Sequence, residues 1–99
     1  MVFYDLPVVT PREKKIYTRF RRFLLRDGYD MIQFSVYARI CNGQDTVNKH
    51  VTRLMSSLPE AGCVRCMQVT EKQFTEIMVL VGEKTKKENK KIAGQLAFF

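Results

Sequence analysis

Apolar and polar positions along the chain follow two different periods, and the change between them predicts the first two elements. Val2-Phe3-Tyr4 is a short apolar strand that ends in an acid, Asp5. From Pro11 to Arg26 the apolar residues recur every three or four positions, which is the period of an amphipathic helix. Its apolar face consists of Ile16, Tyr17, Phe20, Phe23 and Leu24.

The start of this helix is marked by local signals. Thr10 is a good N-cap, Pro11 suits the first helical position, and Glu13 stands where a capping box needs an acid. We therefore expect the helix to begin directly after Thr10.

The next apolar segment, Tyr29 to Ile40, is rich in β-branched and aromatic residues and predicts extended structure. Twelve residues are long for one strand, and the polar Gln33 and Ser35 lie in its middle. They indicate either a bulge or a tight reversal, and a reversal would divide the segment into two strands.

A second helix is predicted from Asp45, as its N-cap, to Leu58, with Pro59 ending it. The spacing predicts a buried face made of Val47, Val51, Leu54, Met55 and Leu58.

Three shorter elements follow. Cys63 to Val69 is a predicted strand, and Thr70 with Gln73 predicts a capped short turn. Met78 to Val81 is a last apolar strand.

This order is β-α-β-β-α-β with an extra C-terminal strand, which predicts an α+β, ferredoxin-like two-layer sandwich. Both helices would cover one face of the sheet. The strands alternate too little with polar residues for the other face to meet water, so we expect a homodimer through the sheet. We assign residues 1–82 to this domain and 83–99 to a Lys-rich linker with an apolar end that docks on the partner subunit.

Charge adds a candidate partner to this fold. The formal net charge is +7, and residues 11–27 hold seven Lys or Arg against Glu13 and Asp27, a balance of +5. A basic stripe on one helix is typical of a protein that binds a polyanion such as nucleic acid. The alternative is a solvated face that only keeps the protein soluble.

Other classes of site have little support. No apolar run could span a membrane and no signal peptide is visible, so we expect a cytoplasmic protein with three reduced cysteines. Cys63 and Cys66 form one C-x-x-C, but in a strand they point to opposite faces, which disfavours a zinc or redox site. The glycines form no phosphate loop, and the scattered acids disfavour a self-contained two-metal nuclease site.

Asp5 is the one acid that suggests a site, since it ends a strand and precedes a loop. Mg²⁺ often takes one or two carboxylates with water and phosphate, and a two-fold axis near Asp5 would supply a second carboxylate from the partner. The alternative is an aspartate that caps a turn through its own backbone.

Four segments together resemble a known family. They are Phe3–Pro7, Gln33–Tyr37, Val69–Phe74 and Val81–Glu83. The sequence resembles the small CRISPR-associated endoribonuclease of spacer acquisition, the second universal adaptation protein, in the version found with type II systems. The likeness covers residues 2–83.

The resemblance implies a ferredoxin-like homodimer whose last strands cross onto the partner's sheet. It implies a Mg²⁺ site at Asp5 of each chain, with Tyr4 beside it and Tyr37 as the aromatic after serine-valine. It also implies that the dimer bridges CRISPR integrase subunits and holds prespacer DNA along its basic surface. The candidate nucleic-acid ligands are Arg12, Lys14, Lys15, Arg19 and Arg22.

Three hypotheses remain open at this point. The first is Mg²⁺-dependent hydrolysis of RNA or DNA, and the second is a DNA-binding scaffold without catalysis, in which the metal site is vestigial. The third is a module that stacks bases of single-stranded RNA on sheet aromatics, which requires Phe3, Phe34 and Tyr37 to be exposed.

Overall fold

A computed structural model describes residues 1–82 as four strands and three helices. Their order is β1 (Val2–Asp5), α1 (Pro11–Arg26), β2 (Asp30–Gln33), β3 (Val36–Ala38), α2 (Gln44–Met55), β4 (Cys63–Cys66) and α3 (Glu71–Thr75). The chain divides into two compact units, Met1–Gln68, which holds the sheet, and a second unit that begins at Val69 and contains α3. The predictions for the Lys-rich linker and the apolar end lie outside the described residues.

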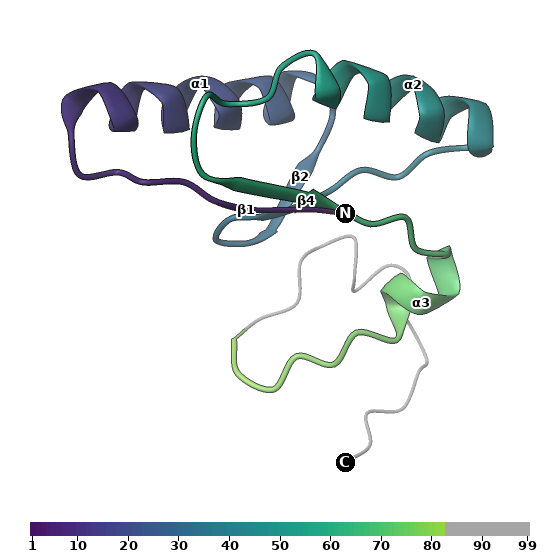
Figure 1. Cartoon of the computed structure of the whole chain (residues 1–99). Coiled ribbons are helices and arrows are strands. Elements are labelled where there is room, and N and C mark those ends of the chain that lie inside the picture. The colour runs from purple at the N-terminus through teal and green to yellow at the C-terminus, as the bar shows by residue number, and fades with distance from the viewer. Residues whose placement is uncertain (83–99) are drawn as a thin grey trace. The chain divides into compact units, whose positions relative to one another are not determined.

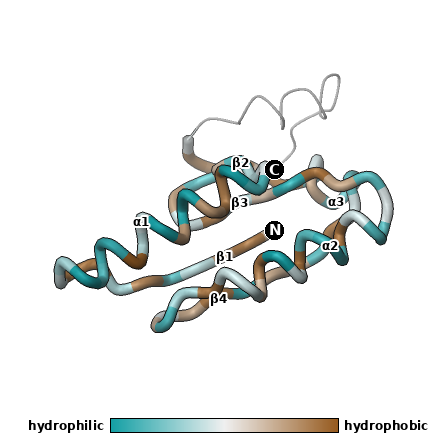
Figure 2. The backbone as a smooth tube through the Cα atoms, turned by 90° about the horizontal axis from the view of Figure 1, so that it is seen from above, coloured by the Kyte–Doolittle hydropathy of each residue, from teal (hydrophilic) through white to brown (hydrophobic). Residues whose placement is uncertain are grey.

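The first unit is the predicted α+β sandwich. Its four strands are antiparallel in the order β2-β3-β1-β4. Helices α1 and α2 both lie on one side of this sheet (Figure 1), and from above β1 runs between them (Figure 2). The β-α-β-β-α-β order and the two layers confirm the ferredoxin-like prediction.

Helix α1 begins and ends as its local signals predict. The Thr10 side chain accepts from the backbone N–H of Glu13, and the Glu13 carboxylate accepts from the N–H of Thr10, so the capping box is complete. Its apolar face is buried at Phe20 and Leu24, while Tyr17 and Phe23 are partly buried against the core.

The segment from Tyr29 to Ile40 contains a tight reversal. Strands β2 and β3 are joined by two residues, Phe34 and Ser35, and Ser35 takes a positive φ of 64°. The backbone N–H of Tyr4 donates to the Ser35 carbonyl at 3.1 Å, which fixes the turn beside β1. A register shift between Met31 and Gln33 adds an irregularity to the β2–β3 pairing.

The core of the unit lies between the sheet and the two helices. Alternate residues of β1 face it, so Val2 and Tyr4 are buried while Phe3 is half-buried and Asp5 is exposed. The core residues are Val2, Tyr4, Leu6, Phe20, Leu24, Tyr29, Tyr37 and Leu54.

Two predictions for the second helix were wrong. It begins at Gln44, with Gly43 as N-cap at a φ of 89°, and not at a capping Asp45. Glycine accepts this backbone conformation without strain, so the N-cap lies two residues before the predicted Asp45 cap. Met55 and Leu58 are 68% and 50% exposed, because α2 ends at Met55 and buries mainly Leu54 and His50.

In the second unit, α3 confirms the predicted capped turn, with Thr70 and Gln73 forming a capping box. The strand predicted over Met78–Val81 was wrong for the chain as described, since this segment is neither helix nor strand. Leu80 and Val81 are 76% and 96% exposed. A strand needs a neighbour to accept its backbone hydrogen bonds, and residues 1–82 provide none for this segment. None of α1, α2 and α3 is long and apolar enough to cross a membrane.

Candidate metal and nucleic-acid site

Asp5 lies at the end of β1, at an end of the sheet that leaves its carboxylate exposed. It pairs with Cys63 of β4 in the sheet register. Within residues 1–82 its carboxylate makes no hydrogen bond and no ion pair. The Asp5 side chain therefore does not cap a turn, and both of its carboxylate oxygens stay available to a ligand.

The backbone at Asp5 is held by a close approach from the start of β4. Gly62 has a φ of 91°, and a Cβ there would meet the Asp5 carbonyl oxygen and the Leu6 side chain, each at 2.6 Å. Only glycine fits such a contact without a shift of the backbone. Gly62 thus keeps β4 against the residue that carries the candidate ligand.

The Asp5 carboxylate suits a hard cation, but one chain alone does not complete a metal site. Carboxylate oxygen is a donor that Mg²⁺ prefers. No cluster of three or more His, Cys, Asp or Glu side chains that could hold a metal occurs in residues 1–82. All three cysteines are free thiols; Cys63 and Cys66 are exposed and Cys41 is half-buried. Residues 1–82 of one chain therefore do not supply three such ligands around Asp5, and a complete site needs oxygen atoms from elsewhere.

Tyr4 and Tyr37 both lie in the core, where Tyr4 directly precedes Asp5 on β1 and Tyr37 of β3 pairs with Val2 at the other end of β1. Their rings stack with centroids 5.8 Å apart, and Tyr4 also packs edge-on against Phe20 at 5.1 Å. Burial, with the neighbouring Tyr37 hydroxyl, raises the pKa of Tyr4 above its usual range, so Tyr4 stays neutral. Its buried hydroxyl has no hydrogen-bond partner among the described residues. Tyr4 thus supports the end of β1 from within the core, and Tyr37, which is only 1% exposed, cannot be reached by a base.

The predicted nucleic-acid ligands all lie on the exposed surface of α1 or at its start. Arg12 forms an ion pair with Glu60 at 2.6 Å, in which both side chains are largely exposed. Such a pair adds little stability, so it leaves Arg12 able to exchange its partner. The exposed cations of the helix are Arg12, Lys14, Lys15, Arg19, Arg21, Arg22 and Arg26.

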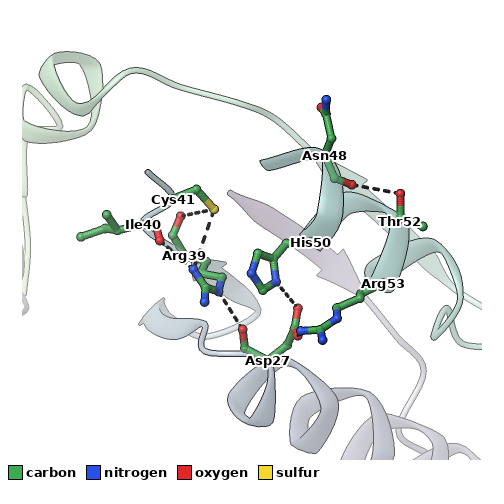
Figure 3. A network of polar contacts seen from close by, with 8 residues as sticks. All are labelled: Asp27, Arg39, Ile40, Cys41, Asn48, His50, Thr52 and Arg53. Atoms are coloured by element: carbon green, nitrogen blue, oxygen red, sulfur yellow. Dashed lines mark hydrogen bonds and ion pairs between the residues drawn. The ribbon is translucent and has the colours of Figure 1, made fainter. Parts of the chain in front are cut away.

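A polar cluster that sequence analysis missed joins α1 to α2 (Figure 3). The Asp27 carboxylate contacts His50 Nδ1 at 2.7 Å and accepts from Arg53 Nη1 at 2.9 Å. The Asp27 carbonyl also accepts from Arg39 Nε at 2.8 Å. These partners are 23, 26 and 12 residues away, so no local spacing could reveal them. The cluster lies at the C-terminal end of α1 and holds the basic helix in place.

Comparisons of this sequence with known proteins all point to the same family. The sequence profile described as CRISPR associated protein Cas2 matches residues 1–77. The chain is 56% identical over 99 residues to the CRISPR-associated endoribonuclease Cas2 of Acidovorax ebreus, covering all of this chain and 97% of that protein. It is 42% identical over 99 residues to the protein of the same name from Flavobacterium psychrophilum, covering 85% of it. A third protein of that name, from Parvibaculum lavamentivorans, is 43% identical over 84 residues, which is 85% of this chain and 83% of that protein.

Proposed function

This chain belongs to the CRISPR associated protein Cas2 family, and from that premise we propose that it is a metal-dependent endoribonuclease of CRISPR adaptation. One observation carries the proposal. The carboxylate of Asp5 is exposed and unpaired within residues 1–82, in a protein whose main helix carries an excess of cations. A protein that cleaves a nucleic-acid backbone with a metal uses both features, cations to bind the phosphates and a carboxylate to bind the divalent metal.

The proposed metal is Mg²⁺, with Asp5 as its protein ligand. When bound there, the ion would lower the pKa of a coordinated water and offset negative charge on the phosphate. Asp5 itself would fix the position of the ion at the end of the sheet. Exposed cations of α1 would hold the neighbouring phosphates and add electrostatic stabilisation. Those we propose for this role are Arg12, Lys14, Lys15, Arg19 and Arg22.

The second carboxylate would come from a second copy of the chain. Strand alternation puts Asp5 on the same face of the sheet as Phe3, and this face is opposite to α1 and α2. Phe3 and its neighbour Val36 are half-buried apolar residues there. If two sheets pack through this face around a two-fold axis, each brings its own Asp5 to the interface. We therefore propose a homodimer that completes the metal site.

Within the adaptation machinery, we propose that the same basic surface also holds prespacer DNA and that the dimer bridges integrase subunits. Phosphate contacts of this kind release counterions, so binding should weaken steeply as salt rises.

The test is cleavage of labelled single-stranded RNA and of duplex DNA, each with Mg²⁺ and with a chelator. It compares the unmodified protein with Asp5→Asn, and Asp45→Asn is the matched control because Asp45 is an exposed aspartate on α2. We expect RNA cutting that needs the metal, is lost in Asp5→Asn and persists in Asp45→Asn. Cutting that survives Asp5→Asn would refute the assigned site.

A second candidate function is a DNA-binding scaffold without catalysis. It is favoured because residues 1–82 contain no cluster of three or more side chains that could hold a metal. It predicts no cutting by the unmodified protein, together with salt-dependent binding of duplex DNA that Asp5→Asn leaves unchanged.

A further inference from the structure

Phe34 is a large apolar side chain in an unusual place. It is 75% exposed at the tip of the β2–β3 hairpin. The hairpin has only two turn residues, and the Ser35 carbonyl accepts from the Tyr4 N–H of β1, so the tip is anchored. An exposed ring on an anchored turn is a fixed feature of the surface.

The ring of Phe34 is also supported from one side. It stacks on Tyr17 of α1 with centroids 6.2 Å apart and an interplanar angle of 26°. Tyr17 in turn meets the buried Tyr4 edge-on at 6.0 Å. An aromatic column thus rises from the core to the surface, and its outermost member, Phe34, is the one that remains largely exposed.

Cations flank this column. Lys14 and Arg21 are exposed and lie three residues before and four residues after Tyr17, so they share its side of the helix one turn away on either side. A flat aromatic surface between two cations matches a nucleotide, which has a π-face and negative phosphates on both sides.

We infer that Phe34, supported by Tyr17, is a stacking platform for one base of a single-stranded nucleic acid, with Lys14 and Arg21 contacting its phosphates. This inference rests on the proposed function and adds to it a preference for unpaired bases. A base within a duplex is stacked on its neighbours and cannot present its face to Phe34. Because Tyr17 belongs to α1, the platform lies on the helix side of the sheet and is separate from the face that carries Asp5.

The test measures affinity for two oligonucleotides of equal length, one of normal single-stranded RNA and one with abasic sites throughout its central part. The protein variants are Phe34→Ala, Phe34→Tyr and Met55→Ala, the last as a control because Met55 is an exposed apolar residue of α2. Because Phe34→Ala loses one base–aromatic stack, it should bind normal RNA about 5-fold to 150-fold more weakly than the unmodified protein does. Binding of the abasic strand should change less than 2-fold, and Phe34→Tyr should restore the affinity.

A second readout follows the base directly. In an oligonucleotide that carries 2-aminopurine, stacking on Phe34 should quench the fluorescence, and Phe34→Ala should relieve the quenching. If normal RNA binds Phe34→Ala as tightly as the unmodified protein, the platform is refuted while the proposed function stands. If neither oligonucleotide binds the unmodified protein, nucleic-acid binding and the platform are both refuted.

Discussion

Replacing Gly62 by alanine should destabilise the protein more than replacing Gly43, although the two glycines have almost the same φ angle. Their φ angles are 91° and 89°. A Cβ at Gly43 would meet nothing within 4 Å, whereas one at Gly62 would lie 2.6 Å from the Asp5 carbonyl oxygen. The pair therefore separates the cost of a positive φ from the cost of a collision with the strand that carries Asp5.

The expected magnitudes follow from these two terms. Gly43 combines its positive φ with a ψ of 162°, a region that glycine almost alone occupies and that costs another residue about 1–3 kcal/mol, so this is the loss we expect for Gly43→Ala. Gly62→Ala adds a forced shift of packed neighbours, which typically costs about 1–3 kcal/mol more. Its total of roughly 2–6 kcal/mol is a large part of the ~5–15 kcal/mol that stabilises an ordinary domain.

Urea unfolding at one fixed protein concentration measures both losses, since the stability of the proposed dimer would depend on concentration. Metal-dependent RNA cutting, measured where each variant is still folded, then reports on the position of Asp5. We expect Gly43→Ala to keep its activity and Gly62→Ala to lose most of it. Equal destabilisation by the two substitutions would refute the claim that Gly62 positions Asp5.

Three further predictions concern single groups. Asp27→Ala leaves the buried His50 without its partner and should lower the free energy of urea unfolding by about 1–3 kcal/mol. Arg53→Ala should lower it by less than about 1 kcal/mol, because Arg53 is half exposed. A larger loss in Arg53→Ala than in Asp27→Ala would contradict this. Hydrogen bonding from the backbone of Thr10 lowers the pKa of the Glu13 carboxyl, so its stabilisation is present above the ordinary pKa of glutamate and is lost as pH falls through the lowered value. The urea midpoint should therefore fall less between pH 6 and about pH 3 in Glu13→Gln than in the unmodified protein. Parallel pH profiles of the two proteins would exclude this role of the Glu13 carboxylate. Burial raises the pKa of Tyr29 to about 12, so its contribution is complete below pH ~10 and is lost as pH rises towards 12; ultraviolet titration of Tyr29→Phe should lack one late-ionising tyrosine.

Elements with local signals could be predicted almost to the residue. Helix α1 starts after Thr10 because its cap, proline and capping glutamate all lie within four residues. The reversal inside Tyr29–Ile40 was one of two alternatives, because Ser35 is not a residue that marks a positive φ. Its position became clear only from the strand pairing.

Features that depend on tertiary contacts could not be predicted. The extent of the buried face of α2 is set by how much of the sheet lies beneath it, so Met55 fits the helical period and is still exposed. The Asp27 cluster joins residues from three parts of the chain and has no sequence period. Asp5 could be singled out because an acid at a strand end is local, but Gly62 opposite it could not, because their contact depends on the β1–β4 pairing.

The position of the hairpin tip relates the proposed platform at Phe34 to the proposed metal ligand, Asp5. Because β1 and β3 are antiparallel with Phe3 opposite Val36, the chain beyond Phe3 runs towards the turn formed by Phe34 and Ser35. Asp5 and Phe34 therefore lie at the same end of the sheet, Asp5 on the face opposite to the helices and Phe34 on the helix side. A single strand whose base stacks on Phe34 would have its backbone at this end, and it could pass around the tip towards Asp5. A duplex is too stiff and too wide to follow such a path. The arrangement thus gives a physical reason for a preference for single-stranded substrates, because an unpaired strand can use both features at once.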